Sequence, residues 1–257
     1  MKIVVINGTE KRGVTYTLKE IFLTSLKVET EVAEYYLPKD CPNFCAGCTS
    51  CFTKGETACK DSIYIQKIEK EMLQADLLVL TSPAYVMHVS GAMKTLLDHL
   101  GYRWLPHRPA KEMFGKRAVI ITQCVGAGGK SAAKDIKHSL SWWGISYIKI
   151  FTAALIEDVI WNKLSQKKRK NIEKKITKYR CKDKQNQLCK ARPYGHCLQI
   201  QVYVLPANSK IGLFIASGKF RRSILERQRL ARQKTPVEKG KDKITSYKIC
   251  TLVLRII

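Results

Sequence analysis

The chain of 257 residues has no run of about 20 apolar residues, the length that a membrane-spanning helix needs. Its start also lacks the apolar core and small-residue cleavage site of a secretory signal, because residues 2–6 form only a short apolar run that ends at a glycine turn. We therefore expect a cytoplasmic protein without a membrane partner. In that compartment the ten cysteines are better explained as metal ligands and free thiols than as a disulfide framework.

Acidic residues are scarce in the last third of the chain, where most of the net charge of +25 is found. Residues 1–160 hold 20 Lys and Arg against 16 Asp and Glu, whereas residues 161–257 hold 26 against 5. The nearly balanced charge of the first part argues against a nucleic-acid-binding function there. We predict a folded domain over residues 1–182 and an irregular basic tail over residues 183–257.

Short apolar runs alternate with segments of helical periodicity along the first 182 residues. The apolar, β-branched runs predict strands over residues 2–7, 28–37, 75–81, 117–123 and 145–151. Helical spacing predicts helices over residues 15–26, 61–74, 90–102, 131–143 and, as a long basic helix, 158–182. This alternation is typical of a five-stranded, doubly wound parallel α/β sheet with helices on both faces. In such sheets, ligands bind beyond the carboxyl ends of the strands.

Three loops at these strand ends have the composition of a nucleotide site. Residues 7–17 combine glycines, hydroxyls and two cations just before a helix N-terminus, where free N–H groups favour a phosphate. Residues 81–91 place a stiff Pro83 and the flat ring of Tyr85 after the central strand. Residues 123–129 are rich in glycine, which lets a backbone approach a planar ligand closely. Each loop taken alone is also compatible with a plain turn, since neither a Walker A nor a G-x-G-x-x-G motif is present.

Four cysteines follow one another with the spacing C-x2-C-x2-C-x7-C inside a loop over residues 41–59: Cys45, Cys48, Cys51 and Cys59. Iron–sulfur clusters are held by such runs, whereas structural zinc prefers two well-separated C-x2-C pairs. The loop is therefore either the ligand shell of a [4Fe–4S] cluster or a set of reduced thiols that shape a substrate loop. The histidines are scattered, and the neighbours Asp98 and His99 predict a surface pair on a helix.

Taken together, these segments resemble the flavodoxin-fold NAD(P)H-dependent FMN reductases, and especially the iron–sulfur flavoproteins. The resemblance covers residues 1–180 and rests on K-I-V-V-I-N-G-T, the cysteine loop followed by Asp61, A-D-L-L-V-L-T-S-P-A-Y-V-M-H-V-S-G-A-M-K-T-L-L-D-H, G-K-R-A-V-I-I-T-Q and S-W-W-G-I. It implies FMN as cofactor, NAD(P)H as electron donor and a quinone, an aromatic compound or a redox protein as acceptor. It also implies a homodimer or higher homo-oligomer.

The resemblance assigns ligand-binding roles along the three loops. The FMN phosphate would be held by Thr9, Lys11, Thr15 and Thr17. The isoalloxazine would be lined by Ser82, Pro83, Ala84 and Tyr85 on one side and by Gln123, Cys124, Val125 and Gly126 on the other. The four cysteines would hold a [4Fe–4S] cluster, and no side chain is identified as a general acid or base. The first loop departs from the family, because Glu10 stands where proline is usual and Val14 replaces an asparagine.

The members of this family end in an aromatic-rich segment, Y-W-x-x-x-G-W-L. The amino-acid sequence of the basic tail does not contain this segment. Residues 223–236 can be encoded by codons that specify A-Y-W-K-D-K-G-W-L-D-K-K-R-P once a single base is dropped. The same step turns residues 198–204 into the family-like F-K-Y-K-F-M-F. We infer that the tail is out of frame. The alternative is a genuine basic tail on a non-catalytic flavodoxin-like binding module, which would engage RNA or an acidic partner.

Overall fold

The structure is a computed structural model that describes residues 1–104, 108, 110–155 and 160–179. All of these residues belong to the first of the two units into which the chain divides, Met1–Phe214 and Ile215–Ile257. The predicted basic tail, its frameshift and the predicted domain limit at residue 182 lie outside the described residues. Among the residues described, no helix has both the length and the apolar character that crossing a bilayer requires.

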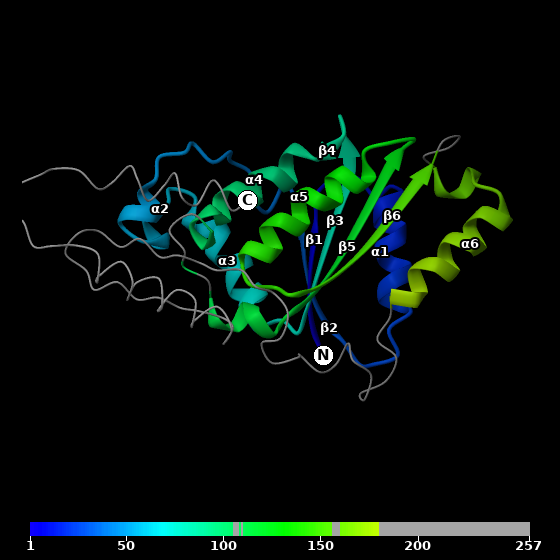
Figure 1. The fold of residues 1–257 in the computed structure, drawn as a ribbon, viewed down its shortest axis with the longest axis horizontal. Coiled ribbons are helices and arrows are strands. Elements are labelled where there is room, and N and C mark those ends of the chain that lie inside the picture. The colour runs from blue at the N-terminus through cyan, green and yellow to red at the C-terminus, as the bar shows by residue number, and fades with distance from the viewer. Residues whose placement is uncertain (105–107, 109, 156–159, 180–257) are drawn as a thin grey trace, which may run out of the picture. The chain divides into compact units, whose positions relative to one another are not determined.

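Five parallel strands form the central sheet in the order β2-β1-β3-β5-β6 (Figure 1). Their bounds are β1 Lys2–Asn7, β2 Glu31–Tyr36, β3 Leu77–Tyr85, β5 Arg117–Val125 and β6 Tyr147–Leu155. A short sixth strand, β4 (His88–Val89), pairs antiparallel with the end of β3. The central strands are buried on both faces, which explains why they are continuous apolar runs in the sequence. The predicted flavodoxin-like parallel sheet is thus confirmed, with β4 as an addition.

Helices cover both faces of the sheet (Figure 1). One face carries α1 (Val14–Thr24) and α6 (Gln166–Ile176), and the other carries α3 (Ser62–Gln74), α4 (Gly91–His99) and α5 (Gly129–Trp142). Successive side chains of a strand point to opposite faces. Ile3 and Val5 of β1 accordingly belong to the hydrophobic cluster of α1 and α6, and Val4 and Ile6 to the cluster of the other three helices.

Several shorter helical segments complete the described part of the chain. The cysteine loop contains α2 (Ser50–Thr53), and the 3-10 turns are η1 Glu56–Ala58, η2 Leu100–Arg103, η3 Lys111–Gly115, η4 Trp161–Lys163 and η5 Thr177–Tyr179. Since η1 ends just before Cys59 and α3 begins at Ser62, the last cysteine is fixed between two regular segments.

The long basic helix predicted over residues 158–182 is wrong in extent. The helix α6 begins only at Gln166, because the Ser165 hydroxyl accepts a hydrogen bond from the Lys168 amide at 3.4 Å and caps the helix. The strands β3 and β5 also run further than predicted. They end at Tyr85 and Val125, whereas the predicted strands ended at residues 81 and 123.

Candidate functional site

The three predicted ligand loops meet at one edge of the sheet. Asn7 at the end of β1 is in register with Thr81 of β3, and Pro83 further along β3 is in register with Gln123 of β5. The side chain of Ser90 joins the first two loops, because its Oγ donates to the Gly8 carbonyl oxygen at 2.5 Å. The carboxyl ends of β1, β3 and β5 therefore form a continuous rim.

Gly8 allows the first loop to leave the sheet in close contact with β3. Its amide donates to the Thr81 carbonyl oxygen at 2.7 Å. A Cβ atom at this position would lie 2.9 Å from that same oxygen and 2.9 Å from Ser90 Oγ, and one of these neighbours is backbone. Only glycine accommodates this approach without a shift of the main chain.

The first turn of α1 begins at this rim, directly after the first loop. Gly13 is its N-cap, and no side chain caps the helix. The N-terminal N–H groups and the positive end of the helix dipole therefore favour an anion. Thr15 is buried, Thr9 and Thr17 are half-buried, and Lys11 is exposed. These residues fit a phosphate, although the Thr17 hydroxyl also donates to the Gly13 carbonyl oxygen at 3.3 Å.

The two departures from the family in this loop have different structural consequences. Val14 is buried in the hydrophobic cluster on the α1 face and so offers nothing polar to a ligand. Glu10 is exposed. Its charge is therefore screened by water and salt.

The second loop is a tight hairpin between β3 and β4. Val86 and Met87 occupy its two turn positions with φ of 46° and 70°, which is the type I′ pattern. Positive φ is unfavourable for a β-branched residue such as valine. The side chains of Tyr85, Val86 and Met87 are all exposed, and Val86 is 94% exposed. Val125 at the end of β5 is exposed as well, so the ends of both strands carry exposed apolar side chains of the kind that bind ligands or partners.

The hairpin packs against the third loop. Gly128 has φ of 91°, and a Cβ atom there would lie 2.8 Å from the Cα atom of Met87. Behind this contact, a Cβ atom at Gly129 would lie 2.9 Å from Cys124 Sγ. The Cys124 thiol is therefore buried beneath the start of α5, and only its backbone can border a ligand.

The Gln123 side chain carries an unpaired polar atom at the rim. The residue is only 8% exposed, and its Nε2 has no hydrogen-bond partner within the described part of the chain. A buried donor without an acceptor is unfavourable, and such groups are rare in folded proteins. A ligand acceptor at this edge would satisfy it. The Ser82 hydroxyl, by contrast, is fully buried and already donates to the Pro83 carbonyl oxygen at 2.8 Å.

The four cysteines of the predicted cluster line a single cavity of about 70 Å³. Cys45 and Cys48 are exposed, whereas Cys51 and Cys59 are half-buried. Burial raises the pKa of the Cys51 thiol, and the nearby thiols of Cys59, Cys45 and Cys48 raise it further. These four sulfurs are thus neighbours. Cys41, also in this loop, is buried, and burial raises its pKa to about 11.

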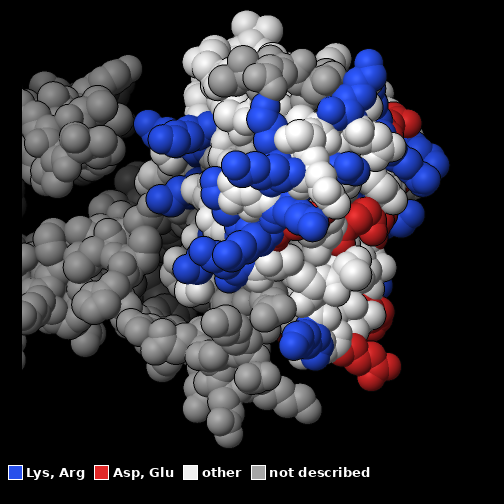
Figure 2. Space-filling model, turned by 90° about the vertical axis from the view of Figure 1, so that its right-hand side faces the viewer, with Lys and Arg blue, Asp and Glu red and all other residues white. Residues whose placement is uncertain are grey.

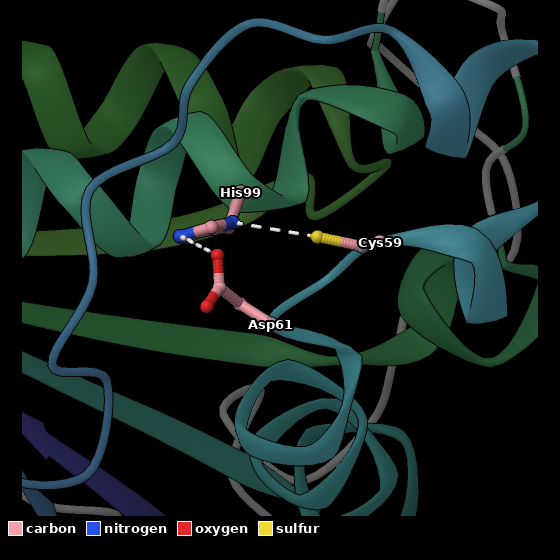
Figure 3. Close-up of side chains that lie close together, drawn as sticks. All are labelled: Cys59, Asp61 and His99. Carbon is pink, nitrogen blue, oxygen red and sulfur yellow. Dashed lines mark hydrogen bonds and ion pairs between the residues drawn. The ribbon is translucent and has the colours of Figure 1, made fainter.

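Asp61 and His99 line the same cavity (Figure 3). His99 Nδ1 lies 3.9 Å from Cys59 Sγ, and His99 Nε2 lies 3.8 Å from Asp61 Oδ2. His99 is only 3% exposed, so the predicted surface pair of Asp98 and His99 is wrong. Asp98 instead pairs with Lys94, one helical turn earlier. Position 99 lies three residues after the buried Leu96, and this helical spacing is the signal that could have placed it inside.

Arginines fix the cysteine loop to the body of the domain. Arg108 donates to the carbonyl oxygens of Cys51 and Phe52 at 3.1 and 2.6 Å. Arg103 in turn donates to the Arg108 carbonyl oxygen at 3.0 Å and to Glu69 of α3 at 2.5 Å. This chain of bonds holds the middle of the loop, so that its thiols stay near the end of α4.

Comparisons with known proteins give a consistent result. The profile of the family described as NADPH-dependent FMN reductase matches residues 1–157. One relative, an iron-sulfur flavoprotein from Archaeoglobus fulgidus, is 27% identical over 139 residues, which cover 54% of this chain and 59% of the relative. A second iron-sulfur flavoprotein from that organism is 35% identical over 99 residues, 38% of this chain and 48% of the relative. The chain thus spans about half the length of these relatives.

Solved structures share the fold. An azoreductase from Bacillus anthracis superposes with a TM-score of 0.52 at 17% identity, over 69% of this chain and 95% of that chain. An FMN-dependent NADH-azoreductase in complex with FMN, also from Bacillus anthracis, gives a TM-score of 0.51 at 14% identity, over 69% and 97%. At these identities the likeness concerns the fold alone.

Proposed function

Because the chain belongs to the NADPH-dependent FMN reductase family, we propose that it is a cytoplasmic FMN-dependent oxidoreductase that takes electrons from NADH or NADPH. Bound FMN would supply the electron chemistry, while the protein binds, orients and shields it. The electrons would pass to a quinone, an aromatic compound or a redox protein. The observation that carries the proposal is the meeting of three loops at one sheet edge, with uncapped helix amides at one end and an exposed apolar hairpin at the other.

Each loop has a distinct task in this proposal. The first turn of α1 would hold the phosphate through its amides and through Thr9, Lys11, Thr15 and Thr17. The planar ring would lie between residues 82–85 and residues 123–126. Gln123 Nε2 would there find the acceptor that it lacks. The hairpin residues would keep water from one side of the ring.

A titration with FMN tests this proposal. We expect the purified protein to carry oxidised-flavin absorbance, or to regain it with added FMN, and then to oxidise NAD(P)H. Thr15→Val should weaken FMN binding by about 10- to 100-fold, the effect of losing a hydrogen bond to a charged group worth about 1.5–3 kcal/mol. Thr24→Val is the matched control at the exposed far end of the same helix and should have no effect. A folded protein that does not bind FMN would overturn the proposal.

We also propose that Cys45, Cys48, Cys51 and Cys59 hold a [4Fe–4S] cluster that relays single electrons from the flavin. The support is that all four thiols line one cavity, and that Cys59, Cys45 and Cys48 lie close enough to Cys51 to add to the rise in its pKa that burial causes. Protein prepared anaerobically should then contain about four irons per chain. Cys48→Ala should abolish the iron and leave FMN binding intact. Iron-free protein from cells with intact cluster assembly would favour the reading as reduced thiols.

The second candidate function is a non-catalytic module that binds RNA or an acidic partner. One observation favours it: the face that carries α6 and α1 gathers Lys and Arg (Figure 2). The exposed cations of α6 include Lys167, Lys170, Lys174 and Lys175. A colourless protein that takes up no FMN but binds RNA with strong salt dependence would support this function. The predicted homo-oligomer is tested in the same preparation by its mass in solution.

A further inference from the structure

We propose that Cys59, Asp61 and His99 form a binding site for a single zinc ion, separate from the flavin site. Figure 3 shows the three side chains directed toward one another from the end of η1, the start of α3 and the end of α4. One ligand atom from each residue lies within 4.8 Å of the other two. Because both would use the Cys59 thiolate within one cavity of about 70 Å³, the zinc ion and the proposed cluster would exclude each other.

The distance between the Cys59 and His99 ligand atoms is close to that in a tetrahedral zinc site. Zinc binds thiolate sulfur at about 2.3 Å and imidazole nitrogen at about 2.0 Å, which places the two ligand atoms about 3.6 Å apart. In the structure, Cys59 Sγ and His99 Nδ1 are 3.9 Å apart. A movement of a few tenths of an ångström would therefore complete this pair of ligands.

His99 is already in the tautomer that a metal ligand needs. Its Nε2 lies 2.8 Å from the carbonyl oxygen of Asn43. A carbonyl oxygen can only accept, so Nε2 carries the proton, and in the neutral imidazole Nδ1 is left as the acceptor, 3.9 Å from Cys59 Sγ. Metal-binding histidines usually donate their other N–H to a carbonyl or carboxylate in this way.

Asp61 has a buried oxygen without a partner. Its side chain is 5% exposed, and its Oδ2 accepts no hydrogen bond. Asp61 is the N-cap residue of α3, where a carboxylate usually accepts an amide of the first turn, but here no such bond is formed. Among the described residues, no Lys or Arg forms an ion pair with Asp61. A buried carboxylate without a cation is unfavourable, and a divalent ion would supply the missing charge.

Asn43 joins two of the three ligands from outside. Its carbonyl oxygen accepts from His99, and its Nδ2 donates to Asp61 Oδ1 at 2.8 Å. Both ligands are thus oriented by one exposed residue that does not itself reach the ion. This arrangement corresponds to the outer shell that supports most protein metal sites.

The chemistry of the three ligands favours zinc. Zinc accepts thiolate, imidazole and carboxylate together, and three protein ligands leave the fourth position for water. The cavity of about 70 Å³ leaves space for such a water, which needs about 10–15 Å³ of such space. On binding, Cys59 would release its proton to solvent and bind as the thiolate.

The test is a zinc titration of the full-length protein freed of iron, with a chromophoric chelator as competitor. We expect one zinc per chain. His99→Gln keeps an N–H that can reach the Asn43 carbonyl oxygen but loses the ligand, and Asp61→Asn loses the carboxylate. Asn43→Ala removes an outer-shell partner and should weaken zinc binding by about 10- to 100-fold. Each of the two ligand variants should weaken zinc binding by more than this.

Cys48→Ser is the matched control, because Cys48 lines the same cavity but is not among the three ligands. It should keep zinc and lose the cluster, whereas His99→Gln should lose zinc and keep the cluster. If His99→Gln fails to fold, two other measurements decide the question. Cys59→Ser should lose zinc, and the cobalt-substituted wild type should show a sulfur–metal absorbance band that Cys59→Ser lacks. Failure of the wild type to bind zinc overturns the proposal. The proposal is also overturned if Cys48→Ser loses zinc while His99→Gln retains it, since this would mean that the cysteine thiolates bind the zinc ion. Neither result bears on FMN binding.

Discussion

Replacement of Gln123 by methionine should change the stability of the flavin-free protein and its affinity for FMN in opposite directions. Methionine has a similar length and no branching, so it fills the same space. It removes a buried amide nitrogen that has no acceptor. A buried unsatisfied donor costs about 1–3 kcal/mol. We expect the free energy of unfolding of the flavin-free protein to rise by about 1 kcal/mol. This is the lower end of that range, because Gln123 keeps slight contact with solvent.

The same change should weaken FMN binding. If Gln123 donates a hydrogen bond to the flavin, its loss removes a net contribution of about 0.5–1.5 kcal/mol, which corresponds to about two- to tenfold in the dissociation constant. Urea unfolding followed by circular dichroism measures the first effect, and fluorescence quenching of FMN measures the second. The midpoint of thermal unfolding should rise by about 2–4 °C, the shift that 1 kcal/mol produces in a domain of this size.

Gln166→Met provides the control. Gln166 is exposed in the first turn of α6, so its replacement should change stability by less than about 0.5 kcal/mol and leave FMN binding unchanged. A loss of stability in Gln123→Met would show that the amide is bonded in the flavin-free protein. An unchanged FMN affinity would show that Gln123 does not face the flavin. Either result would refute the reasoning from the unpaired nitrogen.

Three further results are expected. Gly8→Ala should destabilise the protein by about 1–3 kcal/mol, as measured by urea unfolding, because its Cβ would lie 2.9 Å from the Thr81 carbonyl oxygen; an unchanged midpoint would contradict this contact. Lys19→Met should lower the free energy of unfolding at pH 7 by about 1–3 kcal/mol, less than the 3–5 kcal/mol of a fully buried pair, since Lys19 is fully buried while its partner Glu34 is partly exposed. Burial alone would raise the pKa of Glu34, but the hydrogen bonds from Lys19 and Asn7 lower it below 4.5. The stability that Glu34 provides is therefore present above about pH 4.5 and lost as the pH falls below that value. Urea midpoints between pH 7 and pH 3 should thus fall less steeply in Lys19→Met than in the wild type, and equal slopes would contradict the coupling.

The sheet and the position of the ligand loops could be predicted from the sequence because buried parallel strands are continuous apolar runs. The strand over residues 2–7 was predicted at its observed bounds. The loops that follow these runs necessarily meet at one edge, since the strands are parallel and adjacent. Their assignment to phosphate and ring remains a prediction.

The features that escaped prediction depend on contacts between distant residues. The hairpin at Val86 and Met87 contains neither glycine nor asparagine, which are the usual signals of a type I′ turn. His99 approaches Cys59 only because α4 ends beneath the cysteine loop, 40 residues further along the chain. The start of α6 could not be located from the sequence, because lysines lie on both sides of the Ser165 cap.

The Val86–Met87 turn suggests that this protein is not at its stability optimum. Asparagine at position 86 and glycine at position 87 would fit the observed φ values with less strain. They would also remove the two apolar side chains that stand at the rim of the ligand loops. A strained backbone thus coincides with the side chains that a planar ligand would contact, a combination typical of functional sites. Efforts to make this protein more heat-resistant would therefore find an easy gain at this turn, and that gain would come at the expense of the surface on which the proposed activity depends.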